Sequence, residues 1–190
     1  MKNKKGFTLI ELLAVIVILA ILLAVAIPRV TQYITNSRKD SLVTTAKDFV
    51  DAVTKDATSE IFEFPIATND VTIVSLNMVK LEKGGTKSPF GAKWVDNNCY
   101  VAIINIGTDI DPEYKYFVVL SDSKRYTIPL TAASDVKTDL IYRRSNSKND
   151  ITSFCGSKDG KYMTVGSING LEKYKTGGSW NATIYSESGC

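Results

Sequence analysis

Residues 4–28 of this 190-residue chain read KKGFTLIELLAVIVILAILLAVAIP, and the expected architecture follows from this stretch. It holds 16 consecutive apolar residues without a charge, from Leu12 to Ile27. Counted from Phe7, the stretch has 21 residues up to Ile27. At about 1.5 Å of rise per residue, an α-helix of this length crosses the ~30 Å hydrocarbon core of a bilayer. We therefore predict a membrane-spanning helix.

Three lysines, Lys2, Lys4 and Lys5, precede the apolar run, and a long polar chain follows it. By the positive-inside rule, this places the N-terminus in the cytoplasm and the C-terminus outside. A cleaved secretory signal also joins a basic segment to an apolar one. The run here is longer than such signals usually are, and the stretch 24–28, AVAIP, offers only an ambiguous cleavage site. A retained helix is the better interpretation.

A carboxylate, that of Glu11, lies inside the predicted span. A charged side chain at mid-bilayer costs about 2.5–3.5 kcal/mol, whereas each Leu, Ile, Val or Phe returns ~0.3–0.6 kcal/mol. The twelve such residues from Leu12 to Ile27 outweigh that cost, so the segment is still expected to insert into the bilayer. A buried acid calls for a partner. The alternative is a carboxylate that reaches the interface from the helix end.

Beyond Pro28, apolar residues recur at spacings of three, four or eight, with charged residues between them. This periodicity predicts an amphipathic helix that continues the apolar one, from Phe7 to about Thr58. Pro28 is expected to bend this helix without ending it, because a proline removes one hydrogen bond and clashes one turn back. The apolar positions of the second half are Val30, Ile34, Leu42, Ala46, Phe49, Val50, Val53 and Ala57.

The rest of the chain has the pattern of an antiparallel β-sheet. Short runs rich in β-branched and aromatic residues alternate with turn residues, which is typical of strands. A short helix is expected from Ser134 to Ile141, and 76–81 fits a helix or a strand. The expected strands are 100–106, 114–120, 125–130, 162–165 and 180–185. The predicted fold class is α+β, a long N-terminal helix packed on an antiparallel sheet.

Composition argues against several function classes. The net charge of +3 comes from the three N-terminal lysines, since the chain without residues 1–6 has 20 basic and 20 acidic residues. Without residues 1–6 the chain has no net charge, so it has no overall positive charge that would attract nucleic acid. The chain has no histidine, which removes the commonest general base and metal ligand at neutral pH. With no persuasive catalytic, metal or cofactor constellation, we expect a protein that is not an enzyme.

The segment Gly6-Phe7-Thr8-Leu9-Ile10-Glu11 resembles the class III signal of type IV pilins and pseudopilins. The resemblance implies cleavage between Gly6 and Phe7 by a prepilin peptidase, followed by N-methylation of Phe7. It also implies that Glu11 pairs with the charged N-terminus of a neighbouring subunit and so sets the register of the filament. Pro28 matches a family position where the helix bends. The implied organisation is a leader at 1–6, an assembly helix at 7–28 and a pilin domain at 29–190.

The resemblance implies a structural subunit of a type IV pilus, serving adhesion, motility or DNA uptake. It would enter the cytoplasmic membrane as a single-pass prepilin and then join an extracellular filament at the cell surface. Implied partners are identical and minor pilin subunits, the prepilin peptidase, the assembly ATPase, the platform protein and the membrane. No cofactor and no metal are expected, and no nucleic-acid partner is predicted. The alternatives are a pseudopilin of a type II secretion or competence system, and a membrane-anchored binding domain that does not polymerise.

The chain has three cysteines, Cys99, Cys155 and Cys190, without the close spacing of a zinc or redox motif. The resemblance implies a disulfide between Cys155 and Cys190, like the one that bounds the C-terminal region of many pilins, and it leaves Cys99 as a thiol. Pairing of Cys99 with Cys155 stays open, as do three reduced thiols or a shared metal.

The first prediction concerns processing. Protein recovered from cells is expected to begin at Phe7 and to carry a methyl group on its amine, which intact-mass measurement detects. Gly6→Ala is expected to be cut slowly, whereas Gly6→Val leaves the precursor in the membrane because a bulky side chain hinders entry to the peptidase. Mature protein that begins at Met1 or near Pro28 contradicts this prediction.

Overall fold

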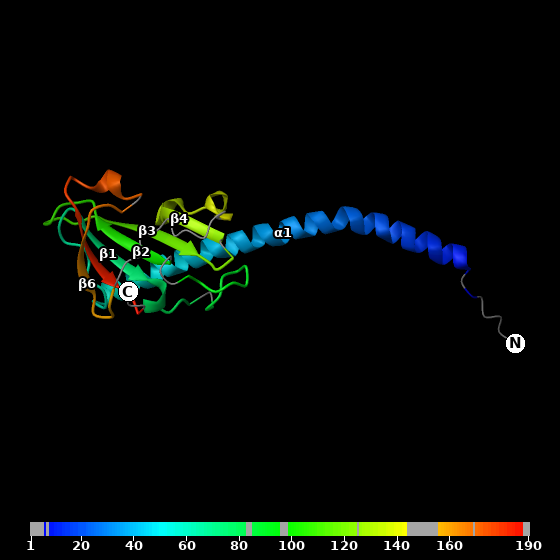
Figure 1. Ribbon diagram of the computed structural model, residues 1–190, viewed down its shortest axis with the longest axis horizontal. Helices are drawn as coiled ribbons and strands as arrows, with labels where there is room; N and C mark the ends of the chain where they lie inside the picture. Colours follow the sequence, from blue (N-terminus) through cyan, green and yellow to red (C-terminus); the bar gives the residue numbers. More distant parts are fainter. Residues whose placement is uncertain are drawn as a thin grey trace. The chain divides into compact units, whose positions relative to one another are not determined.

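A computed structural model of the chain describes residues 6, 8–82, 85–95, 99–124, 126–143, 156–168 and 170–187. Its longest element is helix α1, Leu9–Thr58, with 50 residues (Figure 1). The chain divides into two compact units, residues 1–38 and residues 39–190, and α1 begins in the first and ends in the second. The predicted long helix is confirmed over Leu9–Thr58, and it does not end at Pro28.

Seven strands of the described chain form one sheet in the second unit, in the order β5-β4-β3-β2-β1-β7-β6. Neighbouring strands are antiparallel except β1 and β7, which pair in parallel. The strands are β1 (Asp70–Ser75), β2 (Tyr100–Asn105), β3 (Tyr114–Ser121), β4 (Tyr126–Ala132), β5 (Tyr142–Arg143), β6 (Lys161–Val165) and β7 (Trp180–Tyr185). The predicted α+β fold, a long helix on a mostly antiparallel sheet, is confirmed.

Two local predictions are corrected by the structure. The uncertain element at 76–81 begins with the 3₁₀ turn η1 (Leu76–Met78), and the strand of this region is the preceding β1. The predicted helix from Ser134 to Ile141 is wrong: two separate 3₁₀ turns, η3 (Ala133–Asp135) and η4 (Thr138–Leu140), occupy that stretch. The Ser134 hydroxyl donates to the neighbouring Asp135 carboxylate instead of capping a helix, and the buried Val136 and Ile141 tie the segment to the core.

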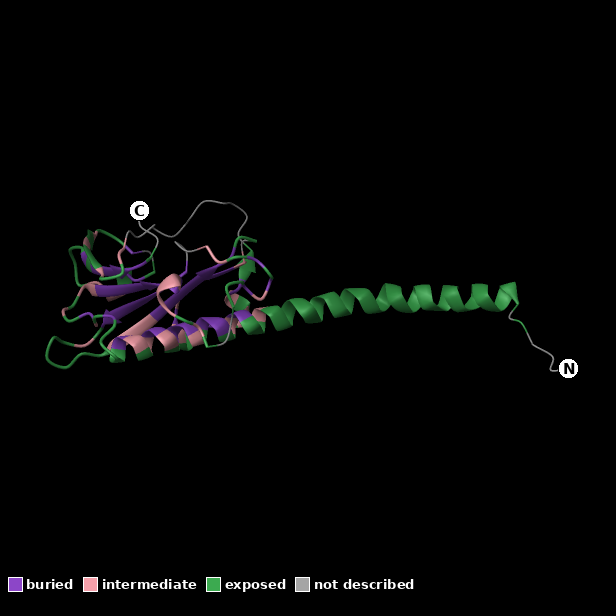
Figure 2. Ribbon diagram, turned by 90° about the horizontal axis from the view of Figure 1, so that it is seen from below, coloured by how far each residue is buried: buried purple, intermediate pink, exposed green. Residues whose placement is uncertain are grey.

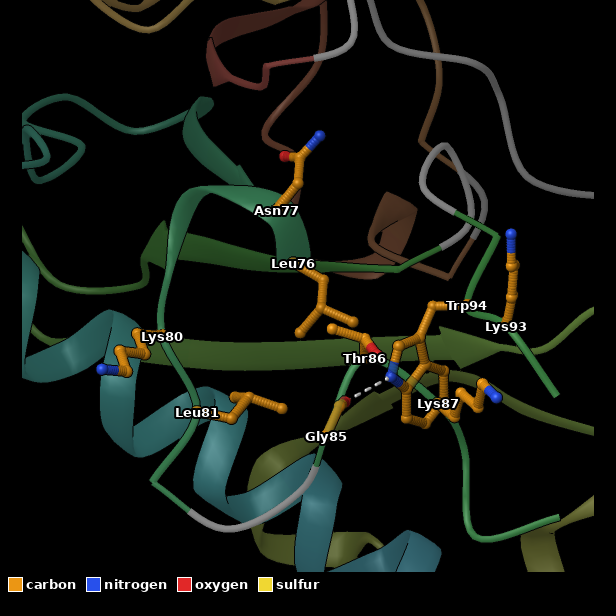
Figure 3. A pocket seen from close by; sticks show the side chains of 9 residues that line it. All are labelled: Leu76, Asn77, Lys80, Leu81, Gly85, Thr86, Lys87, Lys93 and Trp94. Carbon is orange, nitrogen blue, oxygen red and sulfur yellow. Dashed lines mark hydrogen bonds between the residues drawn. The ribbon is translucent and has the colours of Figure 1, made fainter. Parts of the chain in front are cut away.

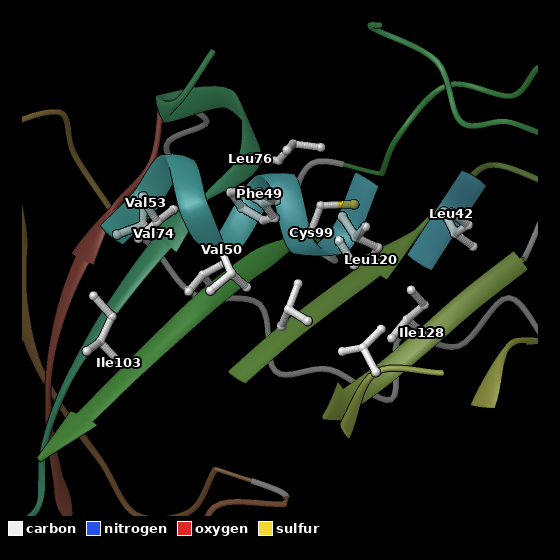
Figure 4. Close-up of a cluster of buried hydrophobic side chains, with 14 of the residues drawn as sticks. Leu42, Phe49, Val50, Val53, Val74, Leu76, Cys99, Ile103, Leu120 and Ile128 are labelled. Atoms are coloured by element: carbon white, nitrogen blue, oxygen red, sulfur yellow. The ribbon is translucent and has the colours of Figure 1, made fainter. Parts of the chain in front are cut away.

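The second half of α1 packs on one face of the sheet through a single stripe (Figure 2). The buried residues of this stripe are Leu42, Thr45, Ala46, Phe49, Val50, Val53 and Ala57, which recur every three or four positions. Apart from Thr45, they share a core with strand residues such as Val74, Ile103 and Leu120 (Figure 4). Val30 and Ile34, predicted as members of the same stripe, are exposed. The buried stripe therefore begins only at Leu42.

The opposite face of the sheet is also covered. Ile168, Leu171 and Trp180 are buried there in a second core with alternate residues of β1, β2, β3 and β7. Glu172, in the turn η5 (Glu172–Tyr174), fastens this covering segment. Its carboxylate accepts the Ile168 N–H at 2.7 Å and lies 2.9 Å from the Lys175 ammonium. The Lys175 hydrogen bond, then that of Ile168, lowers the pKa of Glu172 to about 2.

The second prediction tests the helix–sheet core. Phe49 is 0% exposed, so Phe49→Ala is expected to lower the free energy of unfolding of the second unit by about 3–5 kcal/mol. Val30→Ala is the control, because Val30 is 56% exposed and its truncation is expected to change stability by less than about 0.5 kcal/mol. Urea unfolding of the full chain in detergent, followed by tryptophan fluorescence, measures both. Equal unfolding midpoints for the two variants contradict the packing described.

Candidate functional site

The start of α1 is closed by reciprocal hydrogen bonds between Thr8 and Glu11. The Thr8 N–H and the Thr8 hydroxyl each donate to Glu11 Oε2 at 2.8 Å. The Glu11 N–H approaches Thr8 Oγ1 at 3.3 Å, and the Thr8 carbonyl accepts the Leu12 N–H at 3.2 Å. This is a capping box, in which a threonine and a glutamate three positions later satisfy the orphan donors of the first turn.

Sequence reasoning missed this cap, although Thr8-x-x-Glu11 before an apolar run is its known signature. From the sequence, Glu11 is expected to be an intramembrane acid with a partner or a carboxylate that reaches the interface from the helix end. The structure shows that its side chain already has a local role, because both Thr8 donors end on Oε2. The carboxylate is thus held against the helix N-terminus, where a negative charge also interacts favourably with the helix dipole.

From Thr8 to Arg38, each residue is exposed. The large apolar side chains of this stretch, such as Leu9 at 84% and Ile10 at 73%, contact no core of their own chain. α1 is long and apolar enough, by length and composition, to cross a membrane. Such a surface is unstable in water, so it requires lipid or other protein around it.

A family model described as the prokaryotic N-terminal methylation motif matches residues 1–27. This match supports a type IV pilin-like or pseudopilin-like protein. Proteins of this kind are structural and not enzymatic, and the motif implies processing by a prepilin peptidase and assembly with other pilins in a membrane setting. No curated protein and no solved structure matches the chain significantly.

The predicted processing site lies at the edge of the described structure. Gly6 is exposed, is not helical, and has no atom within 4 Å of the position that a Cβ would take. Phe7 lies outside the described residues. The Gly6–Phe7 cleavage site and the methylation of Phe7 therefore remain predictions.

Pro28 lies within α1, where hydroxyl groups supply local hydrogen bonds. The Thr31 hydroxyl donates to the carbonyl oxygens of Ile27 at 3.0 Å and Pro28 at 2.9 Å. Threonine hydroxyls commonly bond back to the preceding turn in this way. These bonds do not replace the hydrogen bond that Pro28 cannot donate to the Ala24 carbonyl, and such back-bonding often accompanies a bend in the helix.

The cysteine prediction is not tested, because Cys155 and Cys190 lie outside the described residues. Cys99 is buried in the core between α1 and the sheet. Its Sγ lies 3.2 Å from the Ser121 carbonyl oxygen and 3.3 Å from the Ser121 nitrogen. Cys99 thus contributes to packing at the start of β2.

Within the described ranges, no group of three or more His, Cys, Asp or Glu side chains is arranged to hold a metal ion. A groove in the second unit has a volume of about 530 Å³. It is lined by Leu76, Asn77, Lys80, Leu81, Gly85, Thr86, Lys87, Lys93 and Trp94. No sequence motif pointed to this groove, because its lining comes from loops whose conformation depends on the folded sheet.

The third prediction tests the capping box. Thr8→Ala removes the cap and is expected to destabilise the first turn by about 0.5–2 kcal/mol. Amide hydrogen exchange of residues 9–12 in detergent micelles is expected to accelerate accordingly. Thr35→Ala is the control, because the Thr35 hydroxyl donates to the Thr31 carbonyl at 2.9 Å inside the helix and caps nothing. Unchanged exchange at residues 9–12 in Thr8→Ala contradicts the role assigned to Thr8.

Proposed function

We propose that the chain is the precursor of a type IV pilus subunit, cleaved after Gly6, methylated at Phe7 and polymerised into a surface filament. The observation that carries this proposal is the apolar first half of α1, which is exposed along its whole described length. In the membrane, lipid covers this surface. In a filament, the same surface packs against the helices of neighbouring subunits, and the second unit lies outside the bilayer.

In this proposal, Glu11 is the assembly residue. A carboxylate has two oxygens and about four acceptor positions, and the capping box uses one oxygen for two donors. The group therefore keeps capacity for a third donor, which we assign to the methylated Phe7 ammonium of a neighbouring subunit. The cap supports this role because it fixes where the carboxylate lies before the neighbour arrives, which lowers the cost of ordering it.

The ion pair gives the filament its register. Apolar helices slide past one another at little cost, since lipid and leucine side chains are equally apolar. A charged amine and a charged carboxylate in that environment are costly apart and favourable together. Each subunit is thereby held at the position where its Phe7 amine meets a neighbouring Glu11. Pro28 sets where the helix departs from the filament core.

The proposed partners follow from this mechanism. The prepilin peptidase acts first, at the cytoplasmic face. An assembly ATPase and a platform protein then drive subunits from the membrane into the filament, which contains identical and minor pilins. A disulfide between Cys155 and Cys190 would stabilise the C-terminal region once it is outside the cell. The filament would serve adhesion, motility or DNA uptake.

The fourth prediction separates the charge of Glu11 from its cap. Glu11→Gln retains the capping box, because glutamine also fits the third position, but it removes the charge. Both Glu11→Gln and Glu11→Ala are expected to insert and to be cleaved normally. Surface filaments are expected to fall at least about tenfold in both, which corresponds to roughly 1.4 kcal/mol of assembly free energy. Sheared filaments are counted by microscopy, and precursor and mature bands are compared in the membrane fraction.

Three outcomes distinguish the readings of Glu11. Loss of filaments in both variants supports the ion pair. Loss in Glu11→Ala alone assigns the effect to the cap. Normal filament numbers in both variants would falsify the assembly role and favour a membrane-anchored binding domain, for which removal of an intramembrane charge is neutral or beneficial.

A further inference from the structure

The loop between β2 and β3 presents an isoleucine at its tip. Ile110 is 97% exposed and lies between two exposed acids, Asp109 and Asp111. A single exposed isoleucine has no meaning by itself, because such residues are common on protein surfaces. Two further observations concern Ile110. Its loop is held in shape by hydrogen bonds, and the same unit has a surface of matching chemistry.

The loop is held in shape by Asn105 at its base. The Asn105 side-chain oxygen accepts the N–H groups of Gly107 at 2.9 Å and Glu113 at 3.2 Å. Its amide donates to the Ile66 carbonyl at 2.7 Å, and Asn105 itself is buried. A Cβ at Gly107 would clash with the Asp111 carbonyl oxygen, so the tight turn requires glycine. The tip is therefore preorganised, which reduces the entropy lost when it binds.

The matching surface is the groove of about 530 Å³ described above (Figure 3). Leu76, Leu81 and Trp94 give it apolar walls, and the Trp94 indole N–H donates to the Gly85 carbonyl at 3.3 Å. Among the described lining residues, three are lysines and none is acidic. Those lysines, Lys80, Lys87 and Lys93, are exposed. The groove therefore suits an apolar group flanked by negative charges.

The loop and the groove lie at opposite ends of the same strands. The loop joins Asn105 to Tyr114, which pair at one end of β2 and β3. At the other end, Leu76 N–H bonds to the Cys99 carbonyl at 2.9 Å, and Trp94 forms a bridge with Asp122, the residue after β3. Because β3 has eight residues that each rise about 3.4 Å, roughly 25 Å separates the two ends. One molecule cannot bring its own loop to its own groove.

We propose that Ile110 of one copy of this chain enters the Leu76–Leu81–Trp94 groove of a second copy, where Asp109 and Asp111 face the groove lysines. This contact joins two different surfaces, so each subunit has one loop and one groove to offer. Such a head-to-tail contact continues into a ring or an open helical filament. The proposal rests on the filament function proposed above, and it adds a contact between the extracellular domains to the one between the helices.

The test is disulfide cross-linking of full-length chains in intact cells. Ile110→Cys and Lys87→Cys are combined in one chain, and mild oxidant is added. A head-to-tail contact is expected to give a ladder of dimers, trimers and higher species on a non-reducing gel. Each single variant, and Ile110→Cys combined with Asp139→Cys at an exposed site outside the groove, is expected to give no ladder. These controls also account for cross-links through the native cysteines.

Charge reversal gives a second, independent readout. Asp109→Lys with Asp111→Lys, and separately Lys87→Glu with Lys93→Glu, are each expected to lower filament yield at least about tenfold, or roughly 1.4 kcal/mol. Combining the two pairs is expected to restore the yield, since the charges again oppose one another. Reversal of the exposed Asp139 and Asp159 together is the matched control and is expected to leave the yield unchanged.

The ladder, the rescue and the presence of filaments together test both proposals. Filaments with neither ladder nor rescue overturn this contact and leave the filament function standing. A ladder on cells without filaments supports the contact and overturns the pilus function. Cells that show neither overturn both.

Discussion

The apolar, exposed first half of α1 determines which surroundings this chain needs. From Thr8 to Arg38 the chain buries no side chain of its own, although 16 consecutive residues there are apolar. Water is a poor environment for this surface, so lipid or other protein must cover it. The second unit is different: its sheet is covered on one face by α1 and on the other by residues around Leu171. One chain thus combines a self-sufficient domain with a segment that needs an external partner.

Glu11 places a carboxylate in the segment that needs apolar surroundings. This segment therefore needs a partner for the charge as well as a cover for its apolar side chains. The bonds of Glu11 to Thr8 reduce the cost of placing a carboxylate there, since two donors already satisfy one oxygen. They also fix the carboxylate at the helix start. A charge held in one place discriminates between alternative registers better than a flexible one, so the cap and the proposed ion pair reinforce each other. The loop held by Asn105 is preorganised in the same way, because its hydrogen bonds fix the position of Ile110.

The parts of the fold governed by local pattern could be predicted from the sequence. The run from Leu12 to Ile27 predicted the apolar helix, and the spacing of Leu42, Phe49 and Val53 predicted the stripe that packs on the sheet. The β1–β7 pairing could not be predicted, because it joins segments over 100 residues apart in parallel. The turns that replaced the predicted helix after Ser134 are set by burial of Val136 and Ile141. The groove at Trp94 depends in the same way on loops placed by the finished sheet, whereas the Thr8–Glu11 cap was readable and was overlooked.

A helical reconstruction of filaments sheared from cells, at a resolution that shows side chains, locates Glu11 relative to the neighbouring subunits. The account predicts that residues 7–27 of many subunits form the filament core, with no density for residues 1–6. It predicts that each Glu11 carboxylate lies within hydrogen-bond distance of a neighbouring Phe7 amine while it retains its bonds to Thr8. A filament core in which every Glu11 is remote from any neighbouring amine contradicts the account.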